Sequence, residues 1–144
     1  MHEHRQTKTN QGSCLCKKVK ATATHVPHKI GVCHCGMCRK WAGGPFFCVN
    51  VGTDVVFKGT ENIALYDSSE WAERGFCKSC GTHIFYRLKS NQHHFMAVGF
   101  FDSEQPFQFD HQIFIDKKPS YYEFLNQTST MTEEEVFAMF APSS

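Results

Sequence analysis

Seven of the eight cysteines in this chain fall into three short clusters that have the spacing of metal ligands. The clusters are Cys14-x-Cys16, Cys33-x-Cys35-x-x-Cys38 and Cys77-x-x-Cys80, and Cys48 stands alone. The first and third clusters together supply four thiolates, which would close a tetrahedral zinc site. The middle cluster supplies three and would leave one coordination position open. Because closed zinc sites usually stabilise a fold and three-ligand sites do chemistry, the spacing predicts one structural and one working metal.

An even number of cysteines is also compatible with a disulfide framework. Secreted disulfide scaffolds are normally much shorter, whereas this chain has 144 residues and 14 phenylalanines with which to build a core. The first dozen residues are polar and contain no apolar export segment, so we expect a cytoplasmic protein whose cysteines stay thiols or bind metal. Metal binding is therefore the favoured hypothesis.

The overall composition argues against two classes of partner. The formal net charge is +1 and no basic stripe is present, which makes nucleic acid an unfavoured partner. No apolar run approaches the ~18–20 residues that a membrane span requires, so no membrane association is expected. The sequence does not predict the oligomeric state.

The elements that position the cysteines are predicted to be mostly short strands joined by turns. Alternating or apolar segments predict strands at residues 19–25, 30–32, 46–51, 55–57, 63–66, 74–77, 82–88, 93–101 and 111–115. The third cluster lies between two of these strands and is followed by Gly81, which suits the positive φ of a zinc-knuckle turn. We therefore expect a mainly β fold and a single domain over residues 1–144.

Two helical segments are expected. Residues 39–42 can form one helical turn, stopped by Gly43. Near the end of the chain, Thr132 and Glu135 form a capping box at the start of a C-terminal helix. The expected apolar face of that helix consists of Val136, Phe137 and Phe140.

The order of the three clusters resembles the glutathione-dependent formaldehyde-activating enzyme family, which also includes centromere protein V. The matching stretches are Gly-Ser-Cys-x-Cys at 12–16, Cys-His-Cys-x-x-Cys at 33–38 and Gly-Phe-Cys-x-x-Cys-Gly at 75–81. Residues 111–122 are similar to the family's downstream His-rich strand and Lys-Pro-aromatic segment. The resemblance covers about residues 12–122, and three ordered clusters are a far more specific signal than a lone Cys-x-x-Cys.

This resemblance implies a β-tent fold with zinc knuckles and two zinc ions per chain. It assigns the structural zinc to Cys14, Cys16, Cys77 and Cys80, and the catalytic zinc to Cys33, Cys35 and Cys38. It also implies a carbon–sulfur lyase that makes or cleaves the adduct of glutathione and formaldehyde. The expected partner is thus a small-molecule thiol such as glutathione.

The proposed chemistry is consistent with the ligand types. A zinc ion with three thiolates is a soft centre that would accept a substrate thiol in its open position and hold it deprotonated. The hypothesis is therefore a zinc-dependent carbon–sulfur lyase acting on S-hydroxymethyl glutathione or a similar thiol–aldehyde adduct. Two alternatives remain open: a non-catalytic, zinc-stabilised module that binds protein or nucleic acid, and a metal-buffering protein. The thiol, the aldehyde and any acid–base group are not predicted.

Two residues near the middle cluster have competing interpretations. Cys48 could close the middle zinc site as a fourth ligand, but a buried thiol in the 46–51 strand is favoured. His34 lies between two ligands, and because neighbouring residues of a strand face opposite ways, it should point away from Cys33 and Cys35. A contact behind the ligands or with solvent is therefore favoured over ligation.

The remaining polar candidates are weaker. His111 is a functional candidate on the resemblance alone, with an ordinary core or surface histidine as the favoured alternative. His93 and His94 are expected to be solvated. Arg39 and Lys40 could meet a carboxylate of a glutathione-like ligand, or could simply be exposed charges on a short turn.

Overall fold

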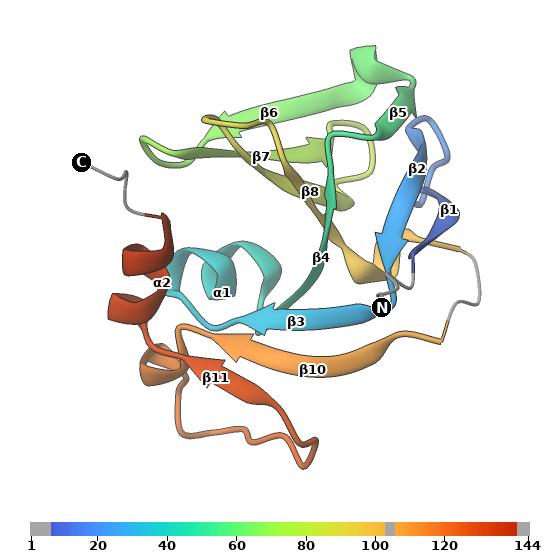
Figure 1. The fold of residues 1–144 in the computed structure, drawn as a ribbon. Helices are drawn as coiled ribbons and strands as arrows, with labels where there is room; N and C mark the ends of the chain where they lie inside the picture. Colours follow the sequence, from blue (N-terminus) through green and yellow to red (C-terminus); the bar gives the residue numbers. More distant parts are fainter. Residues whose placement is uncertain (1–6, 103–105, 141–144) are drawn as a thin grey trace. The chain divides into compact units, whose positions relative to one another are not determined.

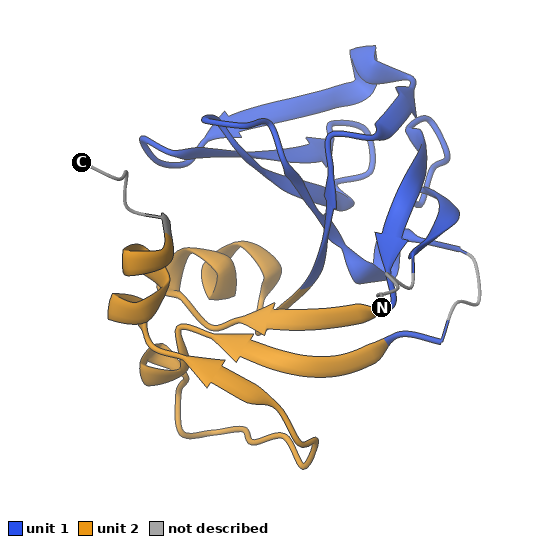
Figure 2. Ribbon diagram, in the orientation of Figure 1, with its two compact units in different colours: residues 1–28, 48–107 blue, residues 29–47, 108–144 orange. Residues whose placement is uncertain are grey.

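The computed structural model describes residues 7–102 and 106–140, and its backbone groups into two compact units. Unit 1 comprises residues 1–28 and 48–107, and unit 2 comprises residues 29–47 and 108–144 (Figure 2). Each unit is therefore built from two stretches that lie far apart in the sequence. The single domain expected from the sequence stays a prediction.

Unit 1 is built from antiparallel strands (Figure 1). One sheet has the order β1 (Thr7–Ser13), β2 (Lys20–Pro27), β5 (Val55–Lys58). A second run of neighbours consists of β4 (Phe46–Gly52), β9 (His94–Ala97), β8 (His83–Leu88), β7 (Ala72–Cys77) and β6 (Ile63–Asp67). Short 3-10 helices occupy Thr60–Asn62 and Val98–Phe100.

The core of unit 1 follows from the apolar positions of these strands. Ala21 and Ala23 alternate with more exposed residues on β2, as expected for a half-buried strand. On β8, by contrast, the adjacent residues Ile84 and Phe85 are both buried, at a point where the register against β7 shifts.

Unit 2 contributes three neighbouring parallel strands to the eight-stranded sheet, in the order β11 (Ser129–Met131), β10 (Gln108–Ile113), β3 (Lys29–Cys33). Helix α1 (Gly36–Ala42) follows β3 directly, a 3-10 turn occupies Ile115–Lys117, and α2 (Glu133–Phe140) ends the described chain (Figure 1). None of the described helices has the length and apolar character needed to cross a membrane.

The predicted mainly β fold with a C-terminal helix is confirmed. The capping box of α2 is present: the Thr132 amide donates to Glu135 Oε1 at 2.7 Å, and the Glu135 amide donates to Thr132 Oγ1 at 3.2 Å. Val136 of this helix is buried, whereas Phe137 is 42% exposed, although its ring packs edge-on against Phe114. The side chain of Phe140 lies outside the described residues.

The elements differ from expectation in several places. Helix α1 starts at Gly36 rather than residue 39, because the Cys35 sulfur accepts a hydrogen bond from the Cys38 amide and caps the helix. The strand expected at 93–101 ends at Ala97 and passes into a 3-10 turn. Strands β1 and β11 were not expected, since their polar sequences carry no apolar alternation.

Candidate metal centres

The four-thiol cluster lies in unit 1, where a turn after β1 meets the turn between β7 and β8. All four sulfurs, from Cys14, Cys16, Cys77 and Cys80, lie within 4.8 Å of one another. The Cys16 sulfur is 3.6 Å from that of Cys14 and 3.7 Å from that of Cys77. A tetrahedron with metal–sulfur bonds of about 2.3 Å has sulfur–sulfur edges of about 3.8 Å. The cluster therefore fits one zinc ion.

Backbone geometry holds this cluster together. Gly81 has φ +80°, and its amide donates to the Cys77 carbonyl at 2.7 Å, which closes the predicted knuckle turn. In the other turn, the Cys14 amide donates to the Val19 carbonyl at 3.0 Å, and the Val19 amide donates to the Cys14 sulfur at 3.3 Å. Amides directed at sulfur favour the thiolate form that binds metal.

The Thr82 hydroxyl links the two turns. It accepts a hydrogen bond from the Leu15 amide at 3.1 Å and lies 3.2 Å from the Cys80 sulfur, to which it can donate. This hydroxyl is the main reason that the pKa of Cys80 is lowered to about 5. The Lys18 amide favours the Cys16 thiolate, but burial and the neighbouring thiols outweigh it and raise the pKa of Cys16 to about 11. Four thiolates cannot coexist here without a cation that neutralises them.

The three-thiol cluster lies in unit 2, at the junction of β3 and α1. The sulfurs of Cys33, Cys35 and Cys38 lie within 4.8 Å of one another. Cys33 and Cys38 are buried and Cys35 is half-buried. Hydrogen bonds that the Cys33 thiol donates to the Cys35 and Cys38 sulfurs, together with burial, raise the pKa of Cys33. The cluster thus has the donor type and convergence that zinc requires, with three ligands among the described residues.

His34 points away from this cluster, and it is fully buried rather than solvated. Its Nδ1 lies 2.7 Å from the Tyr122 hydroxyl, and its Nε2 lies 2.7 Å from Gln112 Oε1. Burial lowers the pKa of His34. Sequence reasoning gave the correct direction for this side chain but missed both partners, which are far away in the chain.

His111 lies on the same face of the β3–β10 pair as Cys33. In the parallel register His111 is opposite Gly31, and Ile113 is opposite Cys33. A Cβ atom added to Gly31 would come within 2.0 Å of His111 Nε2, so the imidazole occupies the space above that glycine. His111 Nδ1 is held 2.7 Å from Asp110 Oδ1, and the side chain is 46% exposed. An exposed imidazole thus faces the same side as a candidate ligand.

The other polar candidates agree with expectation only in part. Arg39 Nε donates to the His34 carbonyl at 2.9 Å, so this guanidinium already supports the cluster backbone. Lys40 is exposed on α1. The expectation that His94 is solvated is wrong: the residue is 7% exposed, lies 3.2 Å from the Gly52 carbonyl, and has its pKa lowered by burial. His93 is half-buried.

Cys48 is half-buried on β4 in unit 1, opposite Ala97 in the antiparallel register. Its environment suits a packed thiol in a strand. That Cys48 does not serve as a fourth ligand of the three-thiol site stays a prediction.

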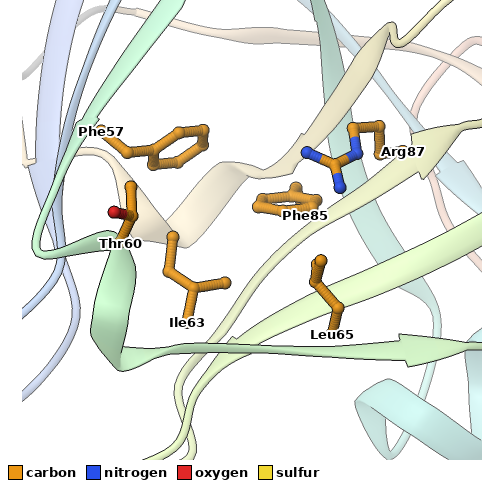
Figure 3. A pocket seen from close by; sticks show the side chains of 6 residues that line it. All are labelled: Phe57, Thr60, Ile63, Leu65, Phe85 and Arg87. Carbon is orange, nitrogen blue, oxygen red and sulfur yellow. The ribbon is translucent and has the colours of Figure 1, made fainter.

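Unit 1 also contains a small cavity of about 160 Å³ that has no thiol in its lining (Figure 3). It is lined by Phe57, Thr60, Ile63, Leu65, Phe85 and Arg87. The Arg87 guanidinium lies over the Phe85 ring at 5.2 Å and is paired with Glu73 at 2.6 Å. With its one charge already neutralised, this cavity has no group for the chemistry expected of the thiol clusters.

Comparisons with known proteins agree with the arrangement of the cysteines. Residues 9–117 match the family model described as glutathione-dependent formaldehyde-activating enzyme. A Schizosaccharomyces pombe protein named as an uncharacterised lyase is 36% identical over 127 residues, which cover 88% of this chain and 93% of that protein. A Halomonas elongata protein provisionally named as a glutathione-dependent formaldehyde-activating enzyme is 31% identical over 85 residues, covering 52% of this chain and 54% of its own length.

One solved structure shares the fold. A crystal structure of a Rhodobacter sphaeroides protein is similar with a TM-score of 0.56 and 23% sequence identity. The similarity covers 67% of this chain and 91% of that one.

Proposed function

Because this chain belongs to the glutathione-dependent formaldehyde-activating enzyme family, we propose that it is a zinc-dependent carbon–sulfur lyase. Its substrate in this proposal is the S-hydroxymethyl adduct of glutathione or of a similar thiol. The observation that carries the proposal is the three-thiol cluster of Cys33, Cys35 and Cys38, which has the ligands for a metal and, within the described residues, no fourth thiol in its group. The four-thiol cluster is proposed to hold a second, structural zinc.

Each part of the three-thiol cluster has a role in this proposal. A zinc ion bound there would take the substrate thiol as its fourth ligand and keep it deprotonated. Cys33 and Cys38 are buried and hold their side of the site dry, whereas the half-buried Cys35 lies toward solvent. The site is thus buried on one side and accessible to solvent on the other, which suits one small ligand that arrives from water.

The reaction requires one carbon–sulfur bond to form or break and one proton to move. In the forming direction, the thiol loses its proton, the sulfur bonds to the aldehyde carbon, and the carbonyl oxygen gains a proton. Cleavage runs in reverse, with the hydroxyl proton removed as the sulfur leaves. We assign the proton transfer to His111, because its imidazole faces the same side as Cys33 and Asp110 holds its Nδ1. Its Nε2 is then the atom that exchanges the proton.

Cobalt substitution tests the proposal. Cobalt(II) would replace zinc at both sites, and glutathione is then added while the sulfur-to-cobalt charge-transfer bands are recorded. A spectral change on addition of glutathione, absent from Cys35→Ser, is the expected result. If glutathione leaves the spectrum unchanged and Cys35→Ser turns over the adduct at the wild-type rate, the lyase proposal fails and the non-catalytic binding module remains.

A Cys48→Ser variant separates an open site from a closed one. If Cys48 is a packed thiol, its removal leaves the cobalt spectrum without glutathione unchanged. A loss of charge-transfer intensity in this variant would show that Cys48 is the fourth ligand and would contradict the open-site proposal.

A further inference from the structure

His34 is fixed by a hydrogen bond at each of its four polar groups. Its amide donates to the Ile113 carbonyl at 3.1 Å, and its carbonyl accepts from Arg39 Nε at 2.9 Å. Its two ring nitrogens contact Tyr122 and Gln112, each at 2.7 Å. A fully buried residue with every polar group in use cannot rotate without breaking several of these bonds.

The position of His34 in the chain gives these bonds a consequence for the thiols. Cys33 ends β3 and Gly36 starts α1, so only His34 and Cys35 connect the strand that carries one ligand to the helix that carries another. The backbone conformation at residue 34 therefore sets the separation of the Cys33 and Cys35 sulfurs. Its side chain anchors that conformation on the face opposite to the cluster.

The partners of His34 are themselves held in place. Gln112 Nε2 donates to Thr128 Oγ1 at 2.9 Å, so its Oε1 is the atom that accepts from His34 Nε2. In the tautomer that carries its hydrogen on Nε2, His34 Nδ1 accepts from the Tyr122 hydroxyl. On the other side, Lys118 Nζ donates to the Pro119 carbonyl at 3.0 Å and to the Tyr122 carbonyl, and it pairs with Glu123 at 2.9 Å. The Lys-Pro-aromatic segment is thus folded around the residue that reaches His34.

We propose that Tyr122 and Gln112 are positioning residues that act through His34 to hold the three-thiol cluster in the geometry that binds zinc. This inference rests on the proposed function only in taking zinc as the occupant of that cluster. The proposed effect of these contacts on the cluster is geometric. Partners placed behind metal ligands change metal affinity by about 10–100-fold when they are removed.

Zinc release from the loaded, full-length protein to a chromophoric chelator tests the proposal without any measurement of turnover. The two clusters should release zinc in two kinetic phases, and Cys35→Ser, which removes one phase, identifies the middle site. Tyr122→Phe removes one hydroxyl and keeps the ring that stacks on His34 at 5.5 Å. We expect it to accelerate the middle-site phase several-fold and to leave the other phase unchanged.

A neighbouring tyrosine offers a matched control. Tyr121 is 75% exposed, so Tyr121→Phe makes the same chemical change one residue away and should leave both phases unchanged. His34→Phe should accelerate the middle-site phase by about 10–100-fold. His34→Gln, which retains a donor toward Gln112, and His34→Asn, which retains an acceptor toward Tyr122, should give intermediate rates.

Two results would overturn the proposal. One is an unchanged middle-site phase in both Tyr122→Phe and His34→Phe. The other is an equal acceleration of both phases, which would show a general loss of stability rather than a local effect. Either result would leave the lyase proposal intact, because cobalt and glutathione test that proposal separately.

Discussion

The two thiol clusters are positioned by different means. In unit 1, the four sulfurs are held by tight turns whose own amides and hydroxyl contact the sulfurs, with Val19 and Thr82 as the main contributors. In unit 2, the residue between two of the three thiols, His34, contacts side chains from distant parts of the chain, Tyr122 and Gln112. The sulfurs of the four-thiol cluster are thus contacted by groups of their own two turns, whereas the contacts described for the three-thiol cluster also involve a residue bonded to distant side chains.

The largest effect is expected from removing a ligand of the four-thiol cluster. Structural zinc contributes an apparent binding free energy of about 10–16 kcal/mol at pH 7, comparable to the ~5–15 kcal/mol net stability of a domain. We therefore expect Cys77→Ser to leave the protein unfolded, or nearly so. Circular dichroism melts and zinc analysis would measure this. Lys78→Ala, which changes an exposed side chain in the same turn, is the control, and a wild-type melt for Cys77→Ser would refute the structural role.

Removing a ligand of the three-thiol cluster should affect activity rather than folding. Cys35→Ser keeps an oxygen that can accept the capping bond of α1, so the change in helix capping should cost about 1 kcal/mol or less. The variant should bind one zinc fewer and show only the uncatalysed rate of adduct turnover. Urea unfolding, metal analysis and a turnover assay would measure these three quantities. If Cys35→Ser unfolds as Cys77→Ser does, the distinction between the clusters is lost.

A smaller effect is expected at Gly31, whose missing side chain leaves room for the His111 imidazole. In Gly31→Ala the new methyl group would displace the ring, at a cost of about 1–3 kcal/mol in the free energy of unfolding. If His111 exchanges the proton, turnover should fall by about 100-fold. Urea unfolding and turnover assays would measure both effects.

Two further variants show whether the loss of turnover in Gly31→Ala comes from the His111 imidazole. Gly99 has open space around its Cβ position, so Gly99→Ala is the control and should change neither quantity. His111→Gln should reproduce the loss of turnover without the loss of stability. Full activity in His111→Gln would exclude the imidazole from the reaction.

The smallest effect concerns the buried histidines, of which each unit has one among its described residues. His34 in unit 2 is bonded at both ring nitrogens, whereas His94 in unit 1 lies against the Gly52 carbonyl and the Phe85 ring. Because burial lowers the pKa of His94, the neutral form is favoured in the folded state. Its contribution to stability is therefore fully present above the unfolded pKa of about 6.5 and is lost as the pH falls from there toward the lower folded value.

Melting temperatures at about pH 7.5 and about pH 5.5 would measure this contribution. We expect the decrease on acidification to be smaller in His94→Gln than in the wild type. His93→Gln, in the same buffers, makes the same change at the neighbouring half-buried residue and is the control. An equal decrease in wild type and His94→Gln would show that His94 does not contribute.

Much of the four-thiol site could be predicted from the sequence because its information is local. The Cys-x-x-Cys-Gly spacing and the positive φ of Gly81 define the knuckle over a few residues. The three-thiol set followed from the spacing of the cysteines. Strand alternation also predicted that the His34 side chain lies away from the thiols. The contacts of His34 could not, because no local pattern links it to residues 78 and 88 positions away.

The missed strands have a related cause. Strand β1 buries Asn10 and Gly12 rather than apolar side chains, so its alternation is invisible to a hydrophobic pattern. Strand β11 has three residues and is recognised only by its parallel pairing with β10. Similarly, the burial of His94 comes from its place between Gly52 and Phe85, which only the folded sheet brings together.

Because unit 2 is built from two separated stretches of sequence, its parts are made at different times during synthesis of the chain. All four ligands of the unit 1 cluster exist once Cys80 has been added to the chain, whereas Tyr122 follows roughly 40 residues later. At ribosomal speeds of about 5–20 residues per second, that gap lasts about 2–8 s. During this interval the thiols of residues 33–38 are present without the side chains that hold them. The four thiols of the first cluster can therefore all be present before the proposed supports of the three-thiol cluster have been made.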